Sequence, residues 1–89
     1  MALLLTLAFG LSDPCISTWA EARYRAYGYD HIVHIRSRCK KAAVCDVSTD
    51  VSPKVQKVGV GAGAHVSVLT FKGSPARSFT PRVSCVFKR

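Results

Sequence analysis

Residues 31–40 read His-Ile-Val-His-Ile-Arg-Ser-Arg-Cys-Lys, and this stretch decides the fold class. Apolar and polar side chains alternate along it with a period of two, which is the sequence signal of a β-strand buried on one side. The predicted inward face consists of His31, Val33, Ile35, Ser37 and Cys39. The predicted outward face consists of Ile32, His34, Arg36, Arg38 and Lys40. The outward face of this strand is therefore basic, and the inward face can join an apolar core.

The rest of the chain repeats the pattern in short runs. Alternating stretches occupy residues 44–51, 55–60, 65–72 and 82–88, and the aromatic, basic stretch 22–29 is a candidate edge strand. Glycine, proline and serine separate the runs, as is typical of turns between strands. Beyond residue 11, only residues 18–25 approach a helical spacing, and one or two helical turns would fit there. We therefore predict one disulfide-stabilised all-β domain over residues 12–89, a small antiparallel β-sandwich of five to six short strands.

Residues 58–63, Val-Gly-Val-Gly-Ala-Gly, are the most glycine-rich stretch of the chain. A phosphate-binding loop needs Gly-Lys-Ser/Thr at the start of a helix, and a dinucleotide fingerprint also needs a following helix. A strand is predicted to follow here, so we expect a hairpin turn instead. The layout of strand, glycine-rich turn, strand and proline-containing loop is similar to that of many immunoglobulin-like modules. The cysteine spacing and the place of Trp19 differ from those of a true immunoglobulin domain.

The first eleven residues, Met-Ala-Leu-Leu-Leu-Thr-Leu-Ala-Phe-Gly-Leu, are apolar and uncharged. The stretch is shorter than the roughly 20 residues that a membrane span needs, and it suits the remnant of a secretory signal peptide. It lacks the usual positive charge ahead of the apolar run, and a buried first strand is the alternative. Cleavage near Ala8 would keep all four cysteines, whereas cleavage after Ala20 would remove Cys15. We expect no transmembrane span, and a secreted or periplasmic protein.

The four cysteines predict a disulfide framework. A domain of 89 residues builds only a small core, which contributes a few kcal/mol by itself, so small exported domains commonly add disulfides. Four cysteines allow three connectivities. A hairpin between the first two long runs would place Cys39 opposite Cys45. We therefore predict the pair Cys39–Cys45, together with a pair Cys15–Cys85 that ties the two ends of the domain.

The charge is strongly positive. Thirteen Lys and Arg residues stand against five Asp and Glu residues, which gives a formal net charge of +8. No acidic residue follows Asp50. Such an excess favours anionic partners, such as nucleic acid, anionic lipid or acidic glycan, although it also serves solubility alone.

The candidate binding site is the basic outward face of the strand over residues 31–40. Successive side chains on one face lie about 6.8 Å apart, since each residue advances a strand by about 3.4 Å, and this spacing suits a row of phosphate or sulfate groups. The alternative is an edge strand whose cations prevent aggregation. The assigned residues are His34, Arg36, Arg38, Lys40 and Lys41, with Tyr27 available to stack on bases or sugars.

No motif in the chain indicates catalysis or a metal. The histidines and serines occur without the nucleophile elbow that a hydrolase triad uses. Cys39 and Cys45 are spaced too widely for a zinc knuckle. His31 and His34 resemble a chelating pair, but three residues apart on a strand they point to opposite faces. We therefore expect no enzymatic activity, no metal and no cofactor.

The leading functional hypothesis is a small, secreted, non-enzymatic module that binds an anionic polymer or surface by charge. No small-molecule substrate is implied. An alternative is an inhibitor or effector that engages a protein partner through the loop at residues 73–78, with Arg77 at its tip. A structural component of an envelope or coat is a further alternative.

Overall fold

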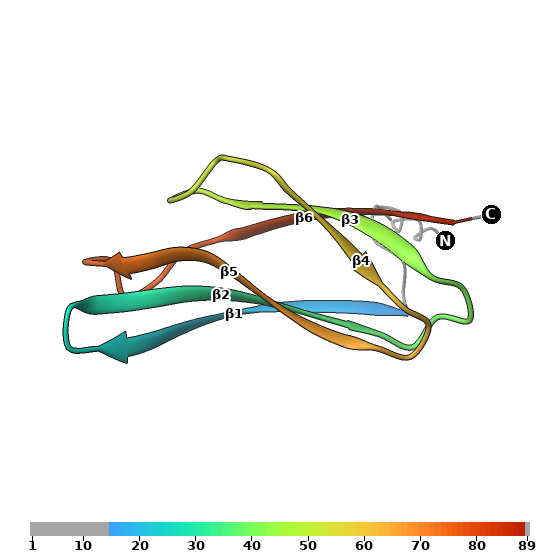
Figure 1. Ribbon diagram of the computed structural model, residues 1–89, viewed down its shortest axis with the longest axis horizontal. Coiled ribbons are helices and arrows are strands. Elements are labelled where there is room, and N and C mark those ends of the chain that lie inside the picture. The colour runs from blue at the N-terminus through green and yellow to red at the C-terminus, as the bar shows by residue number, and fades with distance from the viewer. Residues whose placement is uncertain (1–14, 89) are drawn as a thin grey trace, which may run out of the picture.

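The protein folds into two antiparallel three-stranded β-sheets that lie in separate layers (Figure 1). The computed structural model describes residues 15–88. Its strands are β1 (Ile16–Arg25), β2 (Gly28–Ser37), β3 (Ala43–Thr49), β4 (Gln56–Val60), β5 (His65–Ser74) and β6 (Pro81–Phe87). One sheet has the order β1-β2-β5 and the other has the order β4-β3-β6. The prediction of an all-β protein with a sandwich-like arrangement is confirmed.

The predicted alternation holds from Val33 to Ser37, whereas Ile32, which was predicted to face outward, is buried. Val33 and Ile35 are fully buried, and Arg36 is exposed. Ile35 is the largest fully buried side chain in the described part of the chain. Burying a Val or Ile side chain is worth roughly 1.5–3 kcal/mol, so the inward face of β2 anchors the first sheet to the second. The core cluster that joins the sheets consists of Val33, Ile35, Ala43, Cys45, Val47, Val60 and Val68.

Two local expectations at the start of the chain are wrong. Residues 18–25, where helical turns would fit, belong to β1, which pairs with β2 from Ile16–Ser37 to Arg25–Gly28. A ladder along a whole strand satisfies the backbone of this segment better than one isolated helical turn, whose nucleation is costly. The stretch 22–29 is not a strand of its own, because it contains the turn between β1 and β2.

The predicted disulfide pairing is also wrong, although all four cysteines are in disulfides. The bonds are Cys15–Cys39 and Cys45–Cys85. Cys39 does not face Cys45, because β2 and β3 belong to different sheets and the chain crosses between the layers after β2. Instead, Cys45 lies directly opposite Cys85 in the β3–β6 ladder. The predicted hairpin between β2 and β3 is therefore absent.

The glycine-rich stretch makes a turn, but not the expected hairpin. It connects β4 in one sheet to β5 in the other. The N–H of Ala64 donates to the carbonyl oxygen of Gly61 at 3.0 Å, and Gly63 has a positive φ of 72°. Glycine adopts that conformation without the cost that a side chain brings. The turn thus carries the chain between layers.

The apolar leader over residues 1–11 lies outside the described residues. Within residues 15–88, no helix is long and apolar enough to cross a membrane.

Candidate functional site

The candidate site begins on β2, the central strand of the first sheet, and continues into the connection that follows it. β2 has β1 on one side and β5 on the other. Arg36, the cation of the site that lies on β2, therefore does not guard an open sheet edge, and the edge-protection alternative is wrong for this strand.

Four of the predicted site residues are exposed and close in sequence, and we call them the basic strip: Arg36, Arg38, Lys40 and Lys41. Arg36 is near the end of β2, and the other three follow the connection from β2 toward β3. Among the described residues, none of the four takes part in an ion pair, whereas Arg23, Arg25 and Lys57 each contact a carboxylate. The four cations of the strip are therefore not neutralised by a carboxylate of the described residues.

A shallow pocket of about 410 Å³ lies beside the basic strip. It is lined by the Cys15–Cys39 disulfide, by Phe87 of β6 and by Arg38, Lys40 and Lys41. The disulfide and the aromatic ring give the pocket apolar walls, and the three cations surround them. Such a surface offers both charge and apolar contact to a ligand.

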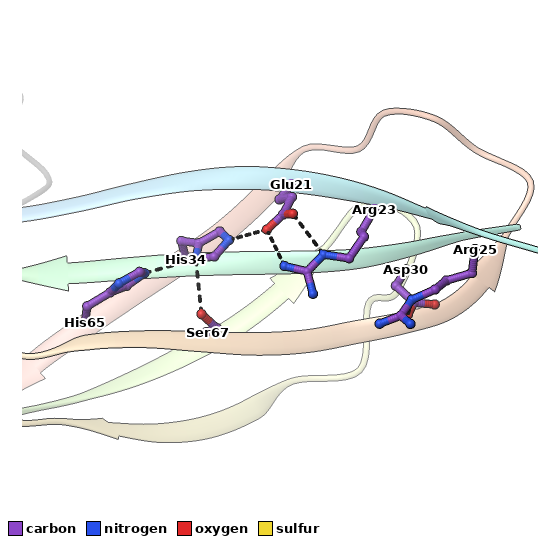
Figure 2. A network of polar contacts seen from close by, with 7 residues as sticks. All are labelled: Glu21, Arg23, Arg25, Asp30, His34, His65 and Ser67. Carbon is purple, nitrogen blue, oxygen red and sulfur yellow. Dashed lines mark hydrogen bonds and ion pairs between the residues drawn. The ribbon is translucent and has the colours of Figure 1, made fainter.

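His34 is placed on the outward face but is not free, as Figure 2 shows. Its Nε2–H donates to Oε1 of Glu21 on β1 at 2.7 Å. On the other side of the ring, Nδ1 lies 3.0 Å from Nε2 of His65 and 3.2 Å from the hydroxyl of Ser67, both on β5. The His34 side chain is only 12% exposed. We therefore separate it from the basic strip.

Glu21 is the anionic end of this network. It accepts the hydrogen bond of His34 and also contacts the guanidinium of Arg23, with 3.1 Å between Arg23 Nε and Glu21 Oε2. The hydrogen bond from His34, followed by that from Arg23, lowers the pKa of the Glu21 carboxyl below its usual value. Glu21 is therefore a carboxylate at neutral pH, and it fixes the orientation of the His34 ring.

Trp19 is the aromatic residue beside the site, and the sequence interpretation missed it. Its ring stacks on His34 at a centroid distance of 5.0 Å and lies 5.4 Å from His65. Trp19 is 42% exposed. A two-residue hairpin turn at Ala26 and Tyr27, with residues 16–25 as a strand, sets the register that places Trp19 opposite His34. That signal was hidden by the helical interpretation of residues 18–25.

Tyr27 lies far from the basic strip. It occupies the turn between β1 and β2, against Gly73, whereas Lys40 and Lys41 follow the opposite end of β2. Ten residues of strand separate the two ends, which is roughly 30 Å. Tyr27 is exposed, but it cannot stack on a ligand that the strip holds at its far end.

Glu21, His34 and Ser67 contact one another in the order of a hydrolase triad, but His65 competes with Ser67 for Nδ1 of His34. A neutral His34 that donates from Nε2 has one lone pair, on Nδ1, to act as a base. His65 Nε2 is closer to that atom than the Ser67 hydroxyl is. Ser67 thus has no dedicated base.

Within residues 15–88, no group of three or more His, Cys, Asp or Glu side chains is arranged to hold a metal ion. No protein-family model, curated protein or solved structure matches this chain.

Proposed function

We propose that this protein is a secreted or periplasmic, non-enzymatic binding module that recognises an anionic polymer or surface by charge. The observation that carries the proposal is the basic strip, a group of four exposed cations, close in sequence, without ion-pair partners in the described part of the chain. The net charge of +8 supports it, because the whole molecule attracts polyanions from a distance. The two facing sheets and the two disulfides would then form a compact, immunoglobulin-like scaffold that holds the basic strip in an exported protein.

Binding of this kind is driven mainly by release of counterions from the polyanion. Each cation that neutralises one phosphate adds about 0.7 to 0.9 to the slope of log affinity against log salt. The strip offers contacts spaced along the chain direction, so it suits a linear polymer. The apolar walls of the neighbouring pocket would add a contact that is insensitive to salt.

We predict that the double variant Arg36→Ala plus Arg38→Ala weakens binding to heparin or DNA and lowers the salt slope by about two, roughly one unit for each lost contact. The free energy of unfolding should change by less than about 0.5 kcal/mol, because both side chains are exposed. Affinity measured at several salt concentrations, with urea unfolding alongside, tests both statements. Unchanged retention on heparin and on DNA would remove the basic strip from the proposal.

A second candidate function rests on the segment at residues 73–78, of which Gly73 and Ser74 end β5 and residues 75–78 belong to the connection to β6. The buried Asp30 accepts the N–H of Gly73 at 3.2 Å, and the buried His31 donates to the carbonyl of Ala76 at 2.8 Å. Two buried side chains of β2 thus fix the loop while Arg77 stays exposed. This arrangement suits the insertion of a preformed loop into a protein partner. Binding through the loop would be lost in Arg77→Ala, would survive in the double variant, and would depend less on salt.

A further inference from the structure

We propose that His34 and His65 form a surface site for a divalent transition-metal ion, and for Cu²⁺ in preference to others. The two rings project from neighbouring strands, β2 and β5, onto the same open face of the sheet (Figure 2). His34 Nδ1 lies 3.0 Å from His65 Nε2. This proposal does not use the basic strip, and it stands or falls independently of polyanion binding.

The separation of the two nitrogens fits coordination to a single ion. Imidazole nitrogen binds such metals at about 2.0–2.1 Å. Two nitrogens bound at a right angle then lie about 2.9 Å apart, and two in a tetrahedral site lie about 3.3 Å apart. The observed distance is close to the right-angle arrangement, which square-planar and tetragonal Cu²⁺ sites use. The two nitrogens now face each other across a hydrogen bond, in which His65 Nε2–H donates to His34 Nδ1. Metal binding would replace this hydrogen bond: the proton of His65 would move to its Nδ1, and both rings would rotate to direct their lone pairs at the shared ion.

The hydrogen bond to Glu21 directs the metal-binding nitrogen of His34 toward His65. A histidine that binds metal commonly donates its other ring N–H to a carboxylate, which fixes the tautomer and raises the basicity of the metal-binding nitrogen. His34 donates from Nε2 to Glu21 at 2.7 Å. The lone pair on a neutral His34 is therefore on Nδ1, the atom that faces His65.

The remaining coordination positions would be open to solvent. His65 and Ser67 are exposed, and the Ser67 hydroxyl lies 3.2 Å from His34 Nδ1. Arg36 is the register partner of His65 on β2, and its positive charge lowers the affinity of the site for every divalent cation alike. Selectivity therefore comes from the donor atoms: a hard cation such as Mg²⁺ prefers oxygen ligands, so two imidazole nitrogens disfavour it. Cu²⁺ binds nitrogen sites most strongly among the divalent first-row metals.

The fluorescence of Trp19 can report binding of Cu²⁺ at this site. It is the single tryptophan of the chain, and its ring lies 5.0 Å from that of His34 and 5.4 Å from that of His65. Titrating the full, disulfide-bonded protein with Cu²⁺ near neutral pH should quench the tryptophan fluorescence saturably, with one ion bound per chain. Electron paramagnetic resonance of the bound Cu²⁺ should show coupling to imidazole nitrogen. Mg²⁺ at the same concentrations should produce neither signal.

Three variants make the test specific. His34→Ala plus His65→Ala should abolish the saturable quenching. Glu21→Gln should weaken Cu²⁺ binding by about 10–100-fold without abolishing it, which is the usual effect of losing the partner of a metal ligand. His65→Ala alone, at an exposed position, should also lose at least about tenfold in affinity, and it keeps the test decisive if the double variant fails to fold. Quenching that persists unchanged in His65→Ala, or a resonance spectrum without nitrogen coupling, would overturn the site.

Discussion

Removing the Cys45–Cys85 disulfide, by Cys45→Ala plus Cys85→Ala, should lower the free energy of unfolding by about 4 kcal/mol. The bond joins residues 40 positions apart, and the chain entropy that such a cross-link removes from the unfolded state is worth about that much. Cys45 is also fully buried in the core. Small domains are stable by only about 5–15 kcal/mol, so the variant should lose a large share of its stability in urea unfolding.

The second disulfide provides the control for this prediction. Cys15–Cys39 spans 24 residues, for which the same entropy estimate gives about 3.5 kcal/mol. Cys15→Ala plus Cys39→Ala should therefore cost slightly less. A loss below about 1 kcal/mol for the Cys45–Cys85 variant would contradict this prediction. It would show that the bond removes much less entropy from the unfolded chain than its 40-residue separation implies.

The second large effect is expected for His31→Ala, which should cost about 3 kcal/mol. His31 is fully buried and stacks on Phe79 with 4.2 Å between the ring centroids. Its Nε2–H donates to the carbonyl oxygen of Ala76 at 2.8 Å. Truncation leaves a cavity in place of the ring and takes away the partner of that carbonyl, and both effects are destabilising. Chemical denaturation measures the loss directly.

His65→Ala is the matched control, because His65 is exposed on the outer face of the same sheet. Its effect should stay within about 0.5 kcal/mol. Equal losses for the two histidine variants would mean that the inward position of His31 contributes nothing, and the assigned inner face of β2 would then be mistaken.

The pleat of β2 could be predicted from the sequence because a buried strand constrains every second side chain. Val33 and Ile35 are too apolar to face water together, and Arg36 and Arg38 are too polar to be buried unpaired. One period-two stretch therefore determined which face of the strand joins the core. The same reasoning predicts that Arg36 faces solvent, and Arg36 is exposed in the structure.

Period-two alternation could not predict which strands pair with each other in a sheet. Local alternation says that a strand has an inner face, but not which strand lies beside it. Assuming that β2 and β3 form a hairpin placed Cys39 opposite Cys45, whereas the chain crosses between the two sheets there. The observed pairing, Cys45–Cys85, joins strands that are distant in sequence, and only the three-dimensional arrangement determines it.

In the candidate site, too, the exposure of side chains could be predicted from the sequence, whereas contacts between strands could not. The exposure of Arg36, Arg38 and Lys40 follows from local alternation. The contacts of His34 with Glu21 and His65 depend on neighbouring strands, so the sequence alone could not show that the His34 ring is already engaged.

We propose that polyanion binding depends on where the positive charge lies, as well as on how much there is. The most direct test compares Arg36→Ala plus Arg38→Ala with Lys54→Ala plus Arg82→Ala, which removes the same charge from exposed positions outside the basic strip. Affinity for a short heparin fragment, measured against salt, should fall steeply in the first variant, with the slope reduced by about two. The second variant should keep a slope close to that of the unmodified protein. Equal losses in the two variants would contradict the assignment of the site to the basic strip.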